Sequence, residues 1–377
     1  MSVIIGDSFM TEDTIPPYDF IPGLDLSEAF YKEAVKPILD EHFPDLVYSA
    51  AHMGTGSDVL GFDTPQSMDH GWGPRLLLLL DKSEFESLHE KVDQILRDNL
   101  PYEIRGFPTN FTEAESKSLL MTPINSGPVN HAVKISTVSE FFIEYFGLIP
   151  DEELLIVDWL TIPEQVFQSI VSGHIFHDGL GEIEPIIERL QYYPHDLWLY
   201  LLASQWRRIG QEVAFMGRCG QVGDELGSRI IGTRLVRDMM KLCFLMEKQY
   251  APYIKWFGTA FSKLKSAKSL TPIFIQIMDA DTWQERENYL IEAYEYIAKM
   301  HNDLGITKSL QAKATQFHDR PFMIIKADHF AEAIQNEIKD DEVKILPPYL
   351  GGIDQYVDST DILGYTNKFR RFWSMYQ

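Results

Sequence analysis

The feature that most constrains the fold is a run of apolar residues at 74–80, PRLLLLL. Five consecutive leucines need a buried position, and the run is too short to form a helix of ordinary length. Pro74 fits the beginning of the segment, because proline within a sheet is confined to edges and to the first residue of a strand. The run therefore predicts a buried β-strand, and neighbouring segments must supply the rest of a sheet.

Several segments around this run have the patterns that such a sheet requires. Apolar residues recur at helical spacing over 27–43 and 83–98. Three further stretches read as strands, namely 46–54 (LVYSAAHMG), 102–108 (YEIRGFP) and 131–137 (HAVKIST). The order of these helices and strands predicts a mixed α/β arrangement for the first part of the chain.

The pattern changes after about residue 138, where helical spacing dominates. The predicted helices are 138–147, 163–172, 182–190, 196–217, 224–248, 252–265, 282–303 and 326–339. We therefore expect an α+β protein in which a small mixed α/β domain is followed by a large all-α helical domain. The expected boundaries are an N-terminal arm at 1–25, the first domain at 26–140 and the helical domain at 141–377. That last range includes an acidic C-terminal segment with Asp354, Asp358 and Asp361.

The composition limits the classes of partner. A net charge of −23 argues against general nucleic-acid binding, which depends on clustered Lys and Arg. An acidic surface would favour a cationic small substrate, although it is also what keeps many proteins soluble. No apolar stretch reaches the roughly 18 residues that a membrane-spanning helix needs. With no sign of an export signal, we expect a cytoplasmic protein.

The stretch at 56–75, GSDVLGFDTPQSMDHGWGPR, leads into the leucine run. A tight turn at Gly56 and Ser57 would let backbone N–H groups approach a phosphate. A nearby carboxylate such as Asp69 could hold Mg²⁺ against that phosphate, and His70 could also bind a metal. A strand holds two metals through carboxylates two residues apart, but Gly71 occupies the second position. The alternative is a plain turn before a buried strand.

This stretch resembles the nucleotidyltransferase superfamily with the polymerase-beta-like fold, in which Gly-Ser precedes Asp-x-Asp or Asp-x-Glu at the start of a strand. The chain is also similar, over nearly its whole length, to a bacterial and fungal family in which a nucleotidyltransferase-like domain precedes a helical domain of unknown function. The stretches that carry this similarity are GSDVLGFD, SMDHGWGPR, DWLTIPEQ, GRCGQVGDELGSR, YAPYIKWFG and GIDQYVDSTD.

The resemblance implies a role for several residues. Gly56 and Ser57 would lie beside the triphosphate of a nucleotide such as ATP, and Asp69 would be the first ligand of Mg²⁺ or Mn²⁺. The family more often has Asp-His-Asp-Trp-Gly where this chain has Asp-His-Gly-Trp-Gly. A third carboxylate usually comes from a later strand, but the strand HAVKIST has the cation Lys134. The carboxylates that could substitute are Asp58, Asp63 and Glu140.

The helical domain offers a second polar group in GRCGQVGDELGSRIIGTRLVRDMMKL. Asp224 fits the N-cap of the helix that follows, and Arg234 and Asp238 are spaced to pair on one helix face. One interpretation is a surface helix with ion pairs. The functional alternative places Arg218 and both acids in a cleft, where Glu225 or Asp224 would act as general base on the hydroxyl of an acceptor.

YAPYIKWFG gives two interpretations of a similar kind. Lys255 beside Trp256 could contact a phosphate while an aromatic ring stacks on a base. The alternative is a packed helix end with a solvated lysine.

The expected function is Mg²⁺-dependent transfer of a nucleoside monophosphate from an NTP to a hydroxyl of an unknown small acceptor. The alternative is a catalytically silent nucleotide-binding or scaffold protein that keeps the fold but lacks the second and third metal carboxylates.

Overall fold

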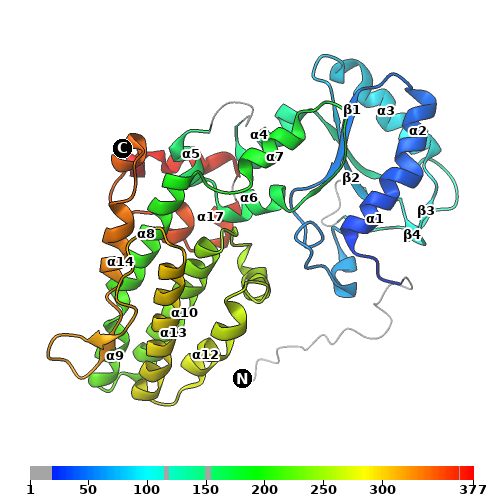
Figure 1. Cartoon of the computed structure of the whole chain (residues 1–377). Coiled ribbons are helices and arrows are strands. Elements are labelled where there is room, and N and C mark those ends of the chain that lie inside the picture. Colours follow the sequence, from blue (N-terminus) through cyan, green and yellow to red (C-terminus); the bar gives the residue numbers. More distant parts are fainter. Residues whose placement is uncertain (1–18, 114–118, 149–153, 365) are drawn as a thin grey trace. The chain divides into compact units, whose positions relative to one another are not determined.

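The computed structural model describes residues 19–113, 119–148, 154–364 and 366–377 (Figure 1). The chain forms two compact units. The first contains the residues up to 143 together with 169–188, and the second contains 144–168 and 189–377. Most of the predicted arm, residues 1–18, lies outside the described residues. The predicted α+β class is confirmed, with the strands of the main sheet in the first unit and a large group of helices in the second.

The first unit is built on a four-stranded sheet of order β5-β2-β1-β6. Its strands are β1 (Tyr48–His52), β2 (Arg75–Leu80), β5 (Ala132–Ser136) and β6 (His174–Asp178). Strand β1 pairs antiparallel with β2 and β6, whereas β2 pairs parallel with β5. The leucine run and the stretches 46–54 and 131–137 thus form strands as predicted. Strand β6 was not predicted.

Helices cover one face of this sheet. The helices of this layer are α1 (Gly23–Phe30), a π-helical turn (Tyr31–Val35), α2 (Lys36–His42) and α3 (Phe85–Asn99). Because side chains alternate along a strand, Leu76, Leu78 and Leu80 of β2 enter the core beneath these helices. Arg75 and Leu77 lie on the opposite face. The stretch 102–108 forms a short hairpin of β3 (Glu103–Ile104) and β4 (Phe107–Pro108).

The second unit is almost entirely helical (Figure 1). Its longer helices are α8 (His195–Glu212), α10 (Glu225–Met246), α12 (Ala267–Asp279), α13 (Trp283–Asp303) and α14 (Ala327–Gln335). Helix α8 packs against α10 and α14, and α10 packs against α12 and α13. No helix among the described residues is long and apolar enough to cross a membrane.

Shorter helices make up the rest of the second unit or span a boundary between the two units. They are α4 (Val138–Phe146), α5 (Ile156–Thr161), α6 (Glu164–Val171), α7 (Ile183–Leu190), α9 (Phe215–Gln221), α11 (Phe257–Phe261), α15 (Asp341–Lys344), α16 (Ile353–Tyr356) and α17 (Thr360–Gly364). A single helix over 252–265 was predicted wrongly, because this stretch holds only a 3₁₀ turn at Ile254–Trp256 and the short α11.

Candidate functional site

The Gly-Ser turn follows β1 directly and is fixed at both ends. The N–H of Gly54 donates to the carbonyl of Ser169 at 2.9 Å, and the N–H of Phe62 donates to the carbonyl of Ser57 at 2.8 Å. Within the described parts of the chain, the N–H groups of Gly56 and Ser57 donate no hydrogen bond. The turn therefore combines a fixed backbone with two unused donors.

A buried ion pair lies beneath this turn. Arg75, the first residue of β2, donates from Nη2 to both carboxylate oxygens of Asp58, at 2.6 and 2.8 Å. The side chain of Asp58 is 1% exposed and also contacts Nε2 of His52 at 2.8 Å. Burial alone would raise the pKa of Asp58, but His52 and Arg75 together hold it well below its ordinary value. Burial also lowers the pKa of His52, so Asp58 is the anion and Arg75 the cation of this cluster.

The close approach of the turn to this pair explains the glycine. A Cβ at Gly56 would lie 2.1 Å from Oδ1 of Asp58 and 2.8 Å from Nη2 of Arg75. No side chain fits there without moving the ion pair. Gly56 thus lets the backbone of the turn lie directly on Asp58 and Arg75, a packing role that differs from the predicted approach to a phosphate.

Arg75 keeps hydrogen-bonding capacity that the protein does not use. Its guanidinium carries five N–H donors, yet only Nη2 has acceptors among the described residues. Nε is buried with no acceptor. A buried donor without a partner is costly, so such a group in a native fold points to a ligand or water that completes it.

Lys134 lies on the same face of the sheet as Arg75. In the parallel pairing of β2 and β5, Arg75 is opposite Ala132 and Lys134 is opposite Leu77. The alternation along the strands therefore places both residues on the face opposite the α1–α3 layer, but the guanidinium of Arg75 turns to Asp58, which lies against Gly23 of α1. Nζ of Lys134 lies 5.7 Å from the ring centre of Phe141. The lysine side chain is exposed.

The carboxylates that could have completed a metal site have other partners. Oδ2 of Asp63 accepts from the N–H of Gly23 at 2.7 Å and from Nε1 of Trp72 at 2.9 Å. Glu140 accepts from the N–H of Thr137 at 3.3 Å, at the beginning of α4. Together with the pairing of Asp58, these contacts give all three candidates a structural role.

Asp69 does not begin a strand, contrary to the expectation from the resemblance. It ends the 3₁₀ helix Pro65–Asp69, and β2 begins only at Arg75. Its carboxylate is half exposed and contacts Nδ1 of its neighbour His70 at 2.9 Å. No group of three or more His, Cys, Asp or Glu side chains that could hold a metal occurs among the described residues. The described side chains around Asp69 therefore do not fit a two-metal centre.

The two acids of the helical unit take structural roles. Asp224 is the N-cap of α10 as predicted, and its Oδ1 accepts from the N–H of Gly227 at 2.8 Å. Glu225 accepts from the N–H of Trp283 at 3.1 Å and lies 3.4 Å from Nη1 of the fully buried Arg286. The contacts of Glu225 connect the beginning of α10 with that of α13. Because both acids have these partners, neither is positioned to act as a general base.

Replacing the N-cap gives a direct test of this structural role. Asp224→Ala is expected to lower the unfolding free energy by about 1 kcal/mol, because the first turn of α10 loses an acceptor for its N–H groups. Urea denaturation would measure the loss. Nucleotide affinity, measured by calorimetry on the same variant, is expected to stay unchanged, and a loss of binding at unchanged stability would restore Asp224 as a site residue.

The other predicted residues of this unit are not brought together either. Arg218 contacts Gln221 on its own helix, at 3.1 Å, and Lys255 lies 5.0 Å from the ring centre of Trp256. The pairing of Arg234 with Asp238 was predicted wrongly. Arg234 contacts Glu212 and Asp238 contacts Arg208, both at 2.9 Å, because neighbouring α8 supplies closer partners.

A polar cluster that the sequence did not reveal lies elsewhere in the second unit. Glu164, at the beginning of α6, and Asp354, in the C-terminal segment, line one small cavity together with Lys241 of α10. The N–H of Glu164 donates to Oδ2 of Asp354 at 2.9 Å, so the acidic segment caps α6 from outside. Glu164 is part of DWLTIPEQ, but no local pattern marks its side chain as buried.

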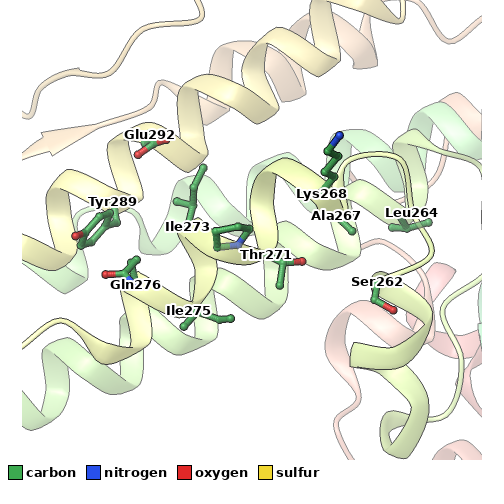
Figure 2. A pocket seen from close by; sticks show the side chains of 11 residues that line it. Ser262, Leu264, Ala267, Lys268, Thr271, Ile273, Ile275, Gln276, Tyr289 and Glu292 are labelled. Carbon is green, nitrogen blue, oxygen red and sulfur yellow. The ribbon is translucent and has the colours of Figure 1, made fainter.

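A broad groove of about 800 Å³ also runs along α12 and α13 (Figure 2). Its walls are mostly apolar, with Ile273 and Ile275 on α12 and Tyr289 on α13. Among the described residues that line it, the charged ones are Lys268 and Glu292. None of the predicted site residues contributes to this groove, so it adds nothing to the phosphate or metal hypothesis.

A comparison with models of known protein families gives a match to part of the chain. Residues 159–257 match the family model of a domain of unknown function, DUF4037. This range holds most of DWLTIPEQ, GRCGQVGDELGSR and YAPYIKWFG, and so supports the expected helical domain of unknown function. Neither a curated protein nor a solved structure matches the chain.

Proposed function

We propose that the first unit binds the phosphates of a nucleotide at the Gly-Ser turn. The observation that carries this proposal is the position of Arg75 beside the turn. Its Nη1 has no acceptor among the described residues, and the N–H groups of Gly56 and Ser57 donate no hydrogen bond there. Guanidinium and backbone N–H donors are the groups that proteins use to hold phosphate oxygens. Lys134 adds a cation on the same face of the sheet.

The proposed binding does not depend on a metal. Nucleotidyl transfer by two metals needs at least two carboxylates aimed at the reacting phosphate. Here Gly71 replaces one, Lys134 replaces another, and Asp58, Asp63 and Glu140 have structural partners. The alternative of a catalytically silent nucleotide-binding protein therefore fits these side chains better than the transferase does.

Calorimetry separates the two alternatives. We expect ATP or GTP to bind the wild type with similar affinity in the presence and absence of Mg²⁺ or Mn²⁺, and Asp69→Ala to leave that affinity unchanged. Lys134→Gln is expected to weaken binding about tenfold, since it removes one charged contact to a phosphate. Lys82→Gln removes the same charge beyond the other end of β2, so it is the matched control and should bind like the wild type.

Two outcomes would contradict this proposal. Binding that requires a metal and is lost in Asp69→Ala would favour the transferase and would justify a screen of hydroxyl-bearing acceptors. If no nucleotide binds the folded protein, the Gly-Ser stretch is a structural turn over the Asp58–Arg75 pair.

A further inference from the structure

Large apolar side chains are exposed together where α9 is followed by α10. They are Phe215 at the beginning of α9, Val222 in the turn after it, and Leu226 and Ile230 in the first turns of α10. These four residues, the α9–α10 patch, are each between 50% and 71% exposed. Elsewhere along the described sequence, exposed large apolar residues occur singly or as pairs. Single exposed apolar residues are normal, whereas a group of them marks an interaction surface.

The patch lies on the outer side of both helices, because their other sides are buried. Helix α9 buries Met216, Gly217 and Gly220, and the first turns of α10 bury Ser228 and Gly232. Leu226 and Ile230 are four residues apart, so they share the opposite face of α10. Since α9 and α10 pack against each other, the patch extends over both helices.

The border of the patch is nearly neutral. Four of the six charged side chains in residues 215–237 have a partner of opposite charge among the described residues. They are Glu225 with Arg286, Arg229 with Asp281, Arg234 with Glu212, and Arg237 with Asp358. The chain as a whole carries a net charge of −23. Two copies of so acidic a chain repel each other least where their surfaces are neutral.

The other two charged side chains have opposite signs and no ion pair within the described parts of the chain. Arg218 donates to the side chain of Gln221 at 3.1 Å, and the carboxylate of Asp224 accepts from the N–H of Gly227 at 2.8 Å. Both Arg218 and Asp224 are exposed. A surface with one unpaired cation and one unpaired anion is complementary to itself, because a two-fold axis brings each charge against its opposite.

We propose that the α9–α10 patch is the contact surface of a homodimer. Two copies would pack their patches about a two-fold axis near Val222, with Arg218 of each copy against Asp224 of the other. The apolar side chains of both copies would leave water together, which supplies the driving force for association. The two ion pairs would fix the orientation of the copies.

Other occupants of the patch fit the charges less well. A strongly acidic or basic partner would meet a border in which most charges are already paired, so it would gain little electrostatic attraction. An anionic membrane would repel a chain with a net charge of −23. This inference goes beyond nucleotide binding and does not depend on it, because the whole patch belongs to the second unit.

Sedimentation equilibrium of the full chain tests the proposal. We expect the wild type to change from one chain to two as its concentration rises. Leu226→Glu and Ile230→Glu change exposed side chains, so both variants should fold, with the urea midpoint of the wild type. Each should raise the dissociation constant of the dimer at least about tenfold, because an unpaired carboxylate would be buried in each copy.

Ile345→Glu is the matched control. Ile345 is 82% exposed and follows α15, whose N-cap Asp340 donates its N–H to Asp196 at the beginning of α8. Phe215 follows the other end of α8, so Ile345 lies away from the α9–α10 patch. This variant should dimerise like the wild type.

A double-mutant cycle tests the two proposed ion pairs. Asp224→Asn keeps an N-cap acceptor for α10 and removes only the charge, as Arg218→Gln does for the cation. Each change should weaken the dimer about threefold or more, since it removes both symmetric pairs. The double variant should dimerise about as tightly as either single one, because both changes remove the same contact.

The proposal is overturned if the wild type stays a single chain at every concentration. It is also overturned if Leu226→Glu and Ile230→Glu dimerise as tightly as Ile345→Glu, or if the losses in Arg218→Gln and Asp224→Asn simply add. Sedimentation is measured without nucleotide, so a failure of nucleotide binding would leave these results untouched.

Discussion

Asp58→Ala is expected to destabilise the first unit by about 3–5 kcal/mol, the cost of removing one partner from a buried ion pair. The guanidinium of Arg75, 17% exposed, would lose the carboxylate that Nη2 contacts at 2.6 and 2.8 Å. His52 would lose its partner as well. Gly56 lies directly on this pair, so the Gly-Ser turn should loosen with it.

Hydrogen exchange measured by mass spectrometry localises this effect. Amides of β1 and β2 should exchange much faster in Asp58→Ala, while those of α8 and α10 in the second unit should keep their protection. Asp69→Ala is the matched control, because Asp69 is half exposed and the partner of its carboxylate among the described residues is its neighbour His70. It should behave like the wild type. Equal protection in both variants would show that the Asp58–Arg75 pair does not hold the turn.

The same cluster predicts how acid affects the first unit. Burial lowers the pKa of His52, so the unfolded chain takes up a proton near pH 6.5 that the folded protein resists. The pKa of Asp58 is also lowered, so its contribution is complete above its ordinary pKa of 3.8 and is lost as the pH falls further. Both shifts act in the same direction and make the first unit less stable in acid.

The elements that could be predicted from the sequence are those whose pattern of apolar residues matches their burial in the fold. The leucine run forms β2 because its five consecutive apolar residues can all be buried in a strand that is covered on both faces. Strand β6 was not predicted because His174–Asp178 is largely polar. The strand lies at the edge of the sheet, where an apolar pattern is not needed. Helix α12 was not predicted, although Ala267, Leu270, Phe274 and Ile277 are buried at helical spacing, because Pro272 lies inside it and proline normally breaks a helix.

The candidate sites show where local sequence stops being informative. The Gly-Ser turn could be singled out from its composition, but the partner of Asp58 could not. Arg75 is seventeen residues away and reaches Asp58 only because β1 and β2 pair side by side. Glu164 and Asp354 are 190 residues apart, and only the packing of the C-terminal segment on α6 joins them.

Glu164→Gln is expected to stabilise the second unit, by an amount that grows with pH. Burial, reinforced by the charge of Asp354, raises the folded pKa of Glu164 to about 8, against an ordinary value of 4.5. Below pH 4.5 the carboxyl is protonated in both states and contributes no penalty. Between pH 4.5 and 8 only the unfolded chain ionises, and the unfolding free energy of the wild type falls by about 1.4 kcal/mol per pH unit relative to the variant.

Urea denaturation at pH 5, 6.5 and 8 measures this difference. The variant should be more stable by no more than about 1 kcal/mol at pH 5 and by roughly 4 kcal/mol at pH 8, above which the difference levels off. Glutamine keeps an acceptor for the N–H of Ala251, so the change removes the ionisable proton and little else. Glu287→Gln should show a smaller effect, because Glu287 is less deeply buried. A constant difference across this range would mean that Glu164 is ionised in the folded protein. Lys241, whose charge already acts on this carboxyl, would then be its cation.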